Sequence, residues 1–244
     1  MSENMTDTYL RPREEAMENI ENYIIEHGLM PGERIPAERV LCDLWNYNRT
    51  TLRGAIKQLT EEGILYSKTG SGTYIAQKKL VRNLQDSQGF YSLVKQAGRK
   101  IDSEVLESGF CEASKYLGKK IQVVLGHKLY KLCRLRYLDD VPVLYETVYF
   151  NAAYLPGIEE YNFNEGSVYE VLKKRYGIEA TRGEEKLSLT RCNLLEAKYL
   201  DVEVGTPAIC QSGVTRDQKE RIFECFKSIT LSKQIAFGSE LRRL

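Results

Sequence analysis

The sequence predicts a mixed α/β protein of two domains, an all-α domain that ends in a β-hairpin wing and an α+β domain built on an antiparallel sheet. The chain has 244 residues, which is ample for two domains. Apolar residues recur at helical spacing near the N-terminus, whereas strand-length segments dominate further along. The polar stretch QKKLVRNLQDSQG, residues 77–89, separates the two patterns and predicts a linker. The predicted domains are therefore 1–76 and 90–244.

Two short helices are predicted before the basic part of the first domain. They span 13–27 and 37–45, and each carries apolar residues at helical spacing. In the second helix Val40, Leu41 and Leu44 fall on one side, so we expect all three to face the core.

A third helix is predicted over 49–62, with Asn48 as its N-cap. Its apolar residues recur with the helical period and form the expected buried stripe, which consists of Leu52, Ala55, Ile56 and Leu59. Arg49, Arg53 and Lys57 follow each other at intervals of four on another face. One helix therefore combines an aliphatic side with a cationic side.

A hairpin is predicted directly after the third helix. Strands at 64–67 and 73–76 flank the glycine-rich tip 68–72. Three helices followed by such a hairpin, within about 65 residues, are the outline of a winged helix-turn-helix domain.

Charge is distributed unevenly along the chain, although the formal net charge is only +1. Residues 49–79 contain six basic and two acidic side chains, whereas residues 1–48 contain four basic and ten acidic ones. A local concentration of positive charge is what binding to a DNA backbone requires.

The composition argues against several classes of site. The six cysteines form no CxxC pair and the two histidines lie far apart, so we expect no metal and no cofactor. No apolar stretch approaches the roughly 20 residues that span a membrane, and residues 1–9 lack an apolar signal-peptide core. We therefore expect a cytoplasmic protein without a membrane partner.

The second domain alternates between strands and short helices. The predicted strands lie near 103–111, 127–138, 142–151, 180–191, 207–216 and 221–232. The predicted helices lie near 91–98, 112–118, 167–176 and 194–200. Asp139 and Asp140 predict a hairpin turn between the second and third strands, and this pattern is typical of an antiparallel sheet.

The first domain resembles the GntR family of bacterial transcription regulators. The resemblance covers residues 12–76 without a gap and rests on GLMPGERIPAER at 28–39, NRTTLR at 48–53, EGILY at 62–66 and GSGTYI at 70–75. Ala37 departs from the pattern, because the family usually has Ser there as the cap of the second helix.

The resemblance implies a set of residues that contact double-stranded DNA. The N-terminal part of the third helix would enter the major groove, where Arg side chains read guanine and Thr side chains bind phosphate. The hairpin tip would lie in or beside the minor groove. The implied residues are Arg39, Asn48, Arg49, Thr50, Thr51, Arg53, Lys68, Thr69, Gly70 and Ser71. Taken alone, such a basic stripe is more typical of a solvated helix face, and it is the surrounding motifs that favour DNA binding.

Residues 90–235 resemble the UTRA effector domain of the HutC-type branch of this family. The landmarks are RLRY at 134–137 before the turn DDVP, then YE at 145–146, GSVY at 166–169, GTP at 205–207 and FE at 223–224. The resemblance implies a chorismate-lyase-like fold that binds small, often phosphorylated, metabolites.

The residues themselves indicate an anion site in this domain. Arg134 and Arg136 are two apart on a predicted strand and so share a face among apolar neighbours, which suits a phosphate or carboxylate. The candidate effector-binding residues are Ser92, Arg134, Arg136, Glu146, Ser167, Tyr169 and Glu224.

Each candidate also has a purely structural interpretation. The two arginines could pair with Glu146 and Glu224 across the sheet. Ser167 could be only the cap of a helix, as the Ser-x-x-Glu pattern ending at residue 170 indicates, and Tyr169 could be only a core residue. Ser92 could be either a helix cap or a ligand contact.

The predicted function is a sequence-specific DNA-binding regulator, a repressor by resemblance, controlled by a small anion such as a phosphorylated sugar or amino sugar. A palindromic operator and a homodimer are implied. One alternative is a regulator that senses a non-sugar organic acid. The other is a lyase-like enzyme with a DNA-binding module. The sequence contains neither a nucleophile elbow nor a glycine-rich phosphate loop, so no enzyme is expected.

Overall fold

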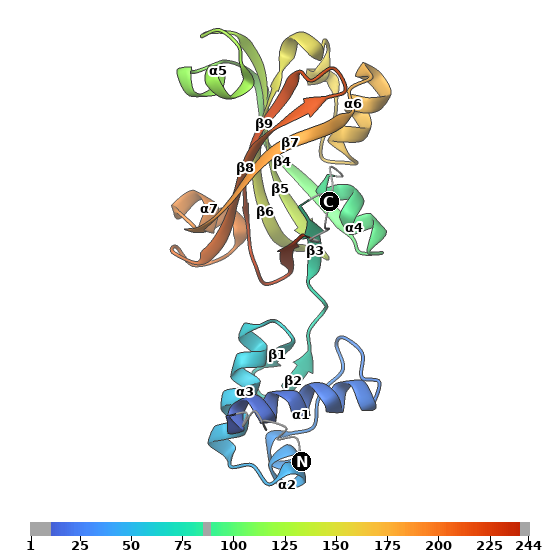
Figure 1. The fold of residues 1–244 in the computed structure, drawn as a ribbon, viewed down its shortest axis with the longest axis vertical. Coiled ribbons are helices and arrows are strands. Elements are labelled where there is room, and N and C mark those ends of the chain that lie inside the picture. The colour runs from blue at the N-terminus through green and yellow to red at the C-terminus, as the bar shows by residue number, and fades with distance from the viewer. Residues whose placement is uncertain (1–10, 85–88, 240–244) are drawn as a thin grey trace, which may run out of the picture. The chain divides into compact units, whose positions relative to one another are not determined.

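The structure is a computed structural model that describes residues 11–84 and 89–239. Within it the chain divides into two compact units, with the boundary between Lys79 and Leu80 (Figure 1). In the part of the chain described here, no helix is long and apolar enough to cross a membrane. The same residues bring together no group of three His, Cys, Asp or Glu side chains that could hold a metal ion.

The first unit contains the predicted three helices and hairpin. Its elements are α1 (Pro12–Glu26), α2 (Glu38–Trp45), α3 (Arg49–Glu61), β1 (Leu65–Lys68) and β2 (Gly72–Ile75). The antiparallel pair β1–β2 starts at Leu65 opposite Ile75, and both of these side chains reach the core formed by the helices. The predicted boundaries are confirmed to within one residue.

The aliphatic stripe of α3 forms the centre of this core. Leu52, Ala55, Ile56 and Leu59 are all buried, as their helical spacing predicted. The prediction for α2 was wrong in part, because Leu41 is buried while Val40 and Leu44 are 54% and 56% exposed. The side of α2 that packs against the core carries Leu41 together with the partly buried Cys42 and Trp45.

The second unit is built on one six-stranded antiparallel sheet with the order β4-β5-β6-β9-β8-β7. The strands are β4 (Ile101–Glu112), β5 (Lys128–Leu138), β6 (Val141–Asn151), β7 (Ala180–Arg191), β8 (Pro207–Asp217) and β9 (Ile222–Thr230). Asp139 and Asp140 both have positive φ, 50° and 65°, which matches the two-residue turn predicted between β5 and β6.

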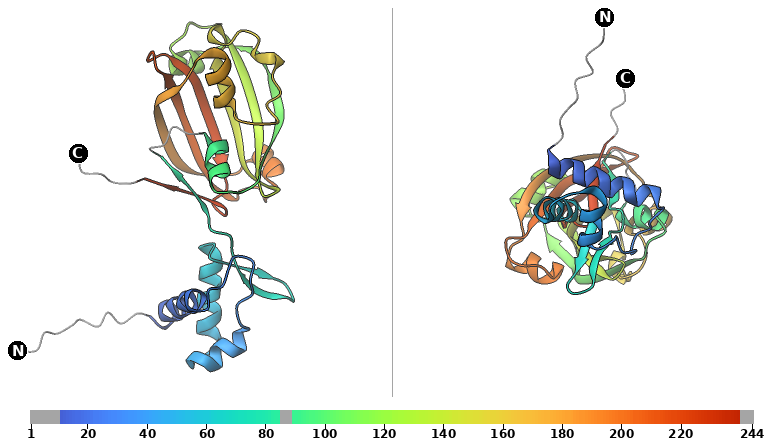
Figure 2. Two further views of the ribbon diagram at one scale, coloured as in Figure 1. Left: turned by 90° about the vertical axis from the view of Figure 1, so that its right-hand side faces the viewer. Right: turned by 90° about the horizontal axis from the view of Figure 1, so that it is seen from below.

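Helices cover both faces of this sheet (Figures 1 and 2). They are α4 (Phe90–Gln96), α5 (Lys115–Ile121), α6 (Val168–Tyr176) and α7 (Leu194–Leu200), with short 3₁₀ turns η1 (Ala152–Tyr154) and η2 (Ile158–Glu160). On one face α6 packs over Leu132 and Val148, and on the other α7 packs near Leu135 and Ile229. The alternation of side chains along β5 and β6 supplies both cores.

The predicted linker 77–89 was too long. Residues Leu80–Asn83 form a strand, β3, which pairs in parallel with β10 (Ile235–Gly238). Leu80 and Ile235 are buried together with α4, so this strand belongs to the second unit. Neither strand was predicted, because the partners lie more than 150 residues apart and the polar sequence of the first gave no apolar alternation.

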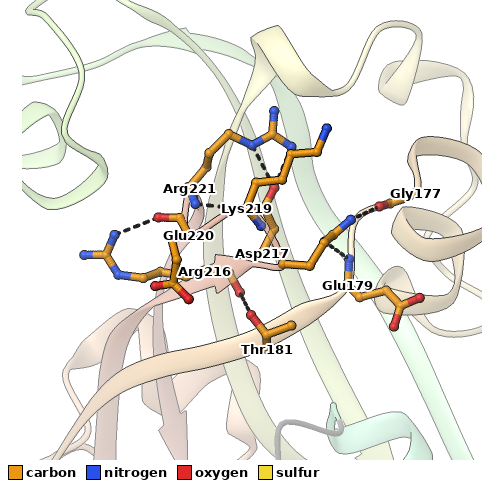
Figure 3. Close-up of polar contacts among 9 residues, drawn as sticks. Gly177, Glu179, Thr181, Arg216, Asp217, Lys219, Glu220 and Arg221 are labelled. Atoms are coloured by element: carbon orange, nitrogen blue, oxygen red, sulfur yellow. Dashed lines mark hydrogen bonds and ion pairs between the residues drawn. The ribbon is translucent and has the colours of Figure 1, made fainter.

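The hairpin between β8 and β9 is tied to the end of α6 (Figure 3). Asp217, fully buried, accepts hydrogen bonds from the backbone of Lys219 and Arg221 at 2.9 Å each and from the Arg221 guanidinium. Gln218 bonds the carbonyl oxygen of Gly177 at 2.5 Å and the amide of Glu179 at 3.0 Å. These contacts hold β7 beside β8 at the end of the sheet where α6 packs.

Candidate nucleic-acid interface and anion pocket

A cluster of exposed guanidiniums lies at the start of α3. Arg49 and Arg53 of α3 and Arg39 of α2 line one surface hollow, together with Arg34 from the loop before α2. All four arginine residues are exposed. The hollow therefore offers several fixed positive charges beside the N-terminus of a helix, which is the arrangement that phosphate and guanine recognition need.

Arg53 is held by an ion pair at the surface. Its Nε lies 2.8 Å from Oε2 of Glu38, and the two side chains are 71% and 39% exposed. Among the described residues, the Nη atoms of Arg53 have no hydrogen-bond or ion-pair partner, so they stay available to a ligand. The cationic face is thus an exposed surface rather than part of an internal network.

The cap of α3 is confirmed, since Asn48 Oδ1 accepts a hydrogen bond from the Thr51 backbone amide at 2.8 Å. Thr50 is exposed in the first turn and Thr51 is half-buried. Ala37 at the N-cap of α2 makes no side-chain cap bond, as its departure from the family pattern predicted. The DNA contacts of Asn48, Thr50 and Thr51 stay predictions.

The wing tip is stiffened by aromatic contacts. Lys68 Nζ lies 5.7 Å and 5.1 Å from the ring centroids of Tyr66 and Tyr74, which stack on each other at 5.5 Å. Ser71 Oγ lies 2.6 Å from the Tyr74 hydroxyl. Gly70, like Thr69, is exposed, and its φ of 72° suits the tight tip. The tip is therefore a preformed projection.

Arg34 is a candidate that the sequence reasoning missed. Its guanidinium lies across Gly72, where a Cβ atom would come within 2.5 Å of Arg34 Nε. The glycine at the tip end of β2 thus makes room for this arginine, which lines the same hollow as Arg39 and Arg49. Its positive charge made Arg34 a possible DNA contact. Its position beside the wing, however, depends on the isolated β-bridge between residues 34 and 74, which the sequence does not predict.

The second unit contains a pocket whose polar floor is one row of the sheet. Arg134 of β5 lies opposite Glu146 of β6, which lies opposite Ser228 of β9, which lies opposite Gln211 of β8. Residues opposite each other in antiparallel strands project from the same face. Arg134, Glu146 and Ser228 line the pocket, a cavity of about 70 Å³.

The two predicted arginines are buried at this pocket and share one carboxylate. Arg134 and Arg136 are 4% and 3% exposed. Glu146 Oε1 accepts from Arg134 Nη2 and lies 3.2 Å from Arg136 Nη1, so the predicted alternative of cross-strand pairing with Glu146 is confirmed. Burial raises the pKa of Glu146, but the positive charges of Arg134 and Arg136 lower it by more, so this pKa lies below its usual value.

Positive charge remains in excess around Glu146. Burial and the neighbouring charge of Arg134 lower the pKa of Arg136 to about 10, so the Arg136 guanidinium is still protonated at neutral pH. Four buried nitrogens have no hydrogen-bond partner among the described residues: Arg134 Nε and Nη1, and Arg136 Nε and Nη2. Such donors are costly to leave unsatisfied, and an anion with several acceptor oxygens would satisfy them.

A second carboxylate occupies the pocket without an arginine partner. Glu224 Oε2 accepts a hydrogen bond from the Tyr169 hydroxyl at 2.7 Å, so the predicted pairing of Glu224 with an arginine was wrong. Burial raises the pKa of Glu224 to about 7, and burial together with the Glu224 charge raises the pKa of Tyr169. Glu224 can therefore act as a donor or as an acceptor near neutral pH.

Six of the seven predicted effector residues line this pocket, and one does not. Ser167 lies at the wall and also accepts from the Glu170 amide at 3.4 Å, as a helix cap should. Ser92 is absent from the wall, and Gly89 rather than Ser92 caps α4. Ser92 lies inside the helix, in its first turn.

Three polar lining residues were not predicted, namely Arg82, Tyr91 and Ser228. The sequence placed Arg82 in the predicted linker. The position of Ser228 beside Glu146 depends on the register between β6 and β9, which the sequence did not predict. Arg82 Nη1 donates to Gln211 Oε1 at 2.7 Å, and its Nη2 lies 3.3 Å from Glu185 Oε1. A third guanidinium thus approaches the pocket from β3.

Comparison with known families assigns both units. Residues 12–75 match the family described as bacterial regulatory proteins, gntR family, and residues 96–235 match the UTRA domain. The HTH-type transcriptional regulator YurK of Bacillus subtilis is 31% identical over 175 residues, which cover 72% of each chain. The HTH-type transcriptional repressor NagR of the same organism is 24% identical over 230 residues, 94% of each chain.

The fold has solved counterparts. The crystal structure of PhnF from Mycobacterium smegmatis superposes with a TM-score of 0.70 at 23% identity, covering 93% of this chain and 99% of that one. The two-domain mixed architecture is therefore the one seen in solved regulators. This protein belongs to the GntR family of bacterial regulatory proteins, as a DNA-binding transcription regulator of the HutC-type branch whose second domain is a UTRA effector domain.

Proposed function

We propose that this regulator is a repressor, active in the cytoplasm as a homodimer on a palindromic operator, that releases DNA when a small anionic metabolite binds its second domain. One observation indicates that the ligand is an anion: four buried guanidinium nitrogens of Arg134 and Arg136 have no hydrogen-bond partner among the described residues. A phosphate or carboxylate supplies the acceptor oxygens that this site lacks.

A phosphorylated sugar or amino sugar fits the rest of the pocket better than a simple acid. Tyr169, Glu224 and Ser228 add hydroxyl and carboxyl groups that can bond sugar hydroxyls or an amine. Two relatives are named as transcriptional repressors, which supports the same role for this chain. One is NagR, and the other, from Escherichia coli, has the name "Probable fructoselysine utilization operon transcriptional repressor" and is 25% identical over 190 residues.

The ligand would act on the segment that joins the second domain to the first. The cavity of about 70 Å³ holds little more than a few water molecules, so a sugar phosphate needs its walls to move apart. Part of that wall is Arg82 of β3, with Phe90 and Tyr91 of α4. β3 follows residues 77–79 directly, so a displaced β3 changes the path to the DNA-binding unit.

A thermal-shift screen tests the ligand class. We expect hexose phosphates and amino-hexose phosphates to stabilise the protein more than inorganic phosphate or citrate, and uncharged sugars to have no effect. Arg134→Met should abolish the stabilisation. Lys131→Met, on the opposite face of the same strand, should preserve it. Stabilisation by uncharged or cationic compounds alone would refute the anion pocket, and a response to citrate alone would favour a sensor of organic acids.

Operator release is tested separately. A stabilising anion should lower the affinity of the full chain for its operator in a gel-shift titration, by the coupling of about 1–3 kcal/mol typical of linked sites. An anion that raises operator affinity would instead make the protein an activator or a co-repressor-dependent regulator.

A further inference from the structure

The side chain of Arg13 in α1 lies against α3 at Gly54. A Cβ atom at Gly54 would come within 3.3 Å of Arg13 Cδ and 3.8 Å of Arg13 Cγ. Gly54 is the one glycine of α3, and glycine is a poor helix former because it loses much backbone freedom when the helix forms. The close approach of the Arg13 side chain accounts for a glycine at this position.

The guanidinium of Arg13 is not used within the fold. Arg13 is exposed, and within residues 11–84 and 89–239 its side chain makes no hydrogen bond and no ion pair. Arg53, the residue before Gly54, differs in this respect, because Oε2 of Glu38 holds its Nε at 2.8 Å. Arg13 therefore offers a full positive charge and all the N–H donors of its guanidinium to a ligand.

Arg13 and the hollow of guanidiniums lie at different flanks of α3. The residues of α3 that line the hollow are Arg49, Arg53 and Ile56. At about 100° per residue these three lie within about 60° of one another, and Gly54 lies about 100° beyond Arg53. Arg34 and Arg39 line the hollow from outside α3. The exposed side of α3 therefore has Arg34 and Arg39 at one flank and Arg13 at the other.

A helix that lies in the major groove of DNA has a sugar-phosphate backbone along each flank. The groove is about 12 Å wide and an α-helix with its side chains is about 10–12 Å across, so the helix fills the groove. Gly54 follows Thr50 by four residues and therefore lies on the same flank, one turn further along α3. Because Thr50 is a predicted phosphate contact, Arg13 is placed to reach the same backbone from α1.

We propose that Arg13 binds a DNA phosphate, as a contact that α1 adds to the interface formed by α3 and the wing. The backbone beside Thr50 then meets Arg13, and the opposite backbone meets Arg34 and Arg39, so guanidiniums hold both strands. The contact involves no base edge and is independent of sequence. It extends the DNA-binding activity of the family and depends neither on the ligand nor on the direction of regulation. Charge counts do not indicate it, because residues 1–48 are acidic as a whole.

The salt dependence of binding to a random-sequence DNA duplex tests this contact. Each phosphate contact contributes about 0.9 to the slope of log affinity against log salt concentration. We expect Arg13→Gln to make this slope shallower by about 1 for each chain bound, and to weaken binding roughly threefold to tenfold at about 0.1 M salt. Fluorescence anisotropy over a series of salt concentrations measures both quantities. A wild-type slope in Arg13→Gln would overturn the contact.

Arg13→Lys separates the charge of the side chain from its shape. A lysine ammonium also binds phosphate, although as a point charge rather than a planar fork. We therefore expect Arg13→Lys to restore the wild-type slope and most of the wild-type affinity. A loss in Arg13→Gln that Arg13→Lys does not restore would also overturn the proposal, because packing against Gly54 rather than charge would then explain the effect.

Lys115→Gln is the matched control for the loss of one positive charge. Lys115 is the first residue of α5 in the second unit, is exposed, and has no side-chain partner among the described residues. Both variants lower the net charge of the chain by one, but only Arg13→Gln removes a DNA contact. We expect Lys115→Gln to keep the wild-type slope. Equal slopes for the two variants would mean that the overall charge of the protein causes the effect, and would contradict a contact at Arg13.

Gly54→Gln tests the position of Arg13 without changing its charge. Glutamine is a good helix former, but its side chain would occupy the space that the Arg13 side chain crosses. We expect Gly54→Gln to weaken binding to the duplex, and to do so less when Arg13 is already replaced by Gln, since the two changes then act on one contact. Equal losses in the two backgrounds would refute a role of Gly54 in positioning Arg13.

The outcomes separate this contact from the rest of the DNA interface. A shallower slope in Arg13→Gln, its recovery in Arg13→Lys and cooperative thermal melting of both variants support the contact. A wild-type slope in Arg13→Gln would remove Arg13 and leave the contacts of α3 and the wing intact. A wild-type chain that binds neither the random-sequence duplex at low salt nor its operator would overturn the contact and the DNA-binding activity together.

Discussion

Arg53 Nε lies 2.8 Å from Glu38 Oε2, so a carboxylate of α2 orients a candidate base-reading arginine of α3. Both side chains are at the surface, and the ion pair itself adds little to stability in water. Its effect is to restrict the rotamers of Arg53 before DNA arrives, which lowers the entropy lost on binding.

Removing Arg53 tests base recognition. We expect Arg53→Ala to lose about 1–3 kcal/mol of operator affinity and to relax specificity at one base position. Lys57→Ala, one turn further along the same face, should cost less and equally for all sequences. Gel-shift titrations against the operator and single-base variants measure both effects, and unchanged operator affinity of the Arg53 variant would remove it from the reading residues.

Removing Glu38 should separate specificity from affinity. Glu38→Ala frees Arg53 and deletes a negative charge near the phosphates, so binding to random DNA should strengthen slightly. The ratio of operator to random-DNA affinity should fall severalfold, because Arg53 is no longer oriented. Fluorescence anisotropy at two salt concentrations measures the ratio. A ratio equal to that of the wild type would mean that Glu38 does not position Arg53.

Removing the carboxylate between the buried arginines should destabilise the free protein and increase its response to anions. Glu146→Gln leaves two buried guanidiniums without a counter-charge, and breaking a buried ion pair costs about 3–5 kcal/mol. Chemical denaturation measures the loss, and inorganic phosphate should recover more stability than it gives the wild type. Glu107→Gln is the control, because Glu107 pairs with Lys131 at the surface, 61% exposed, and should change stability by less than about 1 kcal/mol.

Glu224 should make stability depend on pH near neutrality. Its pKa is about 7 in the folded protein, above the 4.5 of a free glutamate. As pH rises through this interval the unfolded chain loses the proton first, so unfolding becomes easier by up to about 3 kcal/mol between pH 4.5 and 7. Glu224→Gln, whose amide oxygen can still accept from Tyr169, should lose this slope.

Urea titrations at several pH values compare the wild type with Glu224→Gln. The variant should gain stability relative to the wild type at pH 8 but not at pH 4. Parallel pH profiles for the two proteins would contradict a raised Glu224 pKa.

Much of the fold could be predicted because it is encoded locally. The stripe from Leu52 to Leu59 and the Asn48 cap determine α3, and the Asp139–Asp140 turn determines the β5–β6 hairpin. Arg134 and Arg136 could be predicted as neighbours because strand alternation places residues two apart on one face.

Only the tertiary structure decided which distant residues meet. Register across three strands brings Arg134, Glu146 and Ser228 into one row, and the pairing of β3 with β10 takes Arg82 out of a supposed linker and into the pocket wall. Sequence patterns report the period of a helix or strand, which depends on adjacent residues. Strand order and register depend on the free energy of packing the whole sheet, to which every strand contributes, so no local segment encodes them.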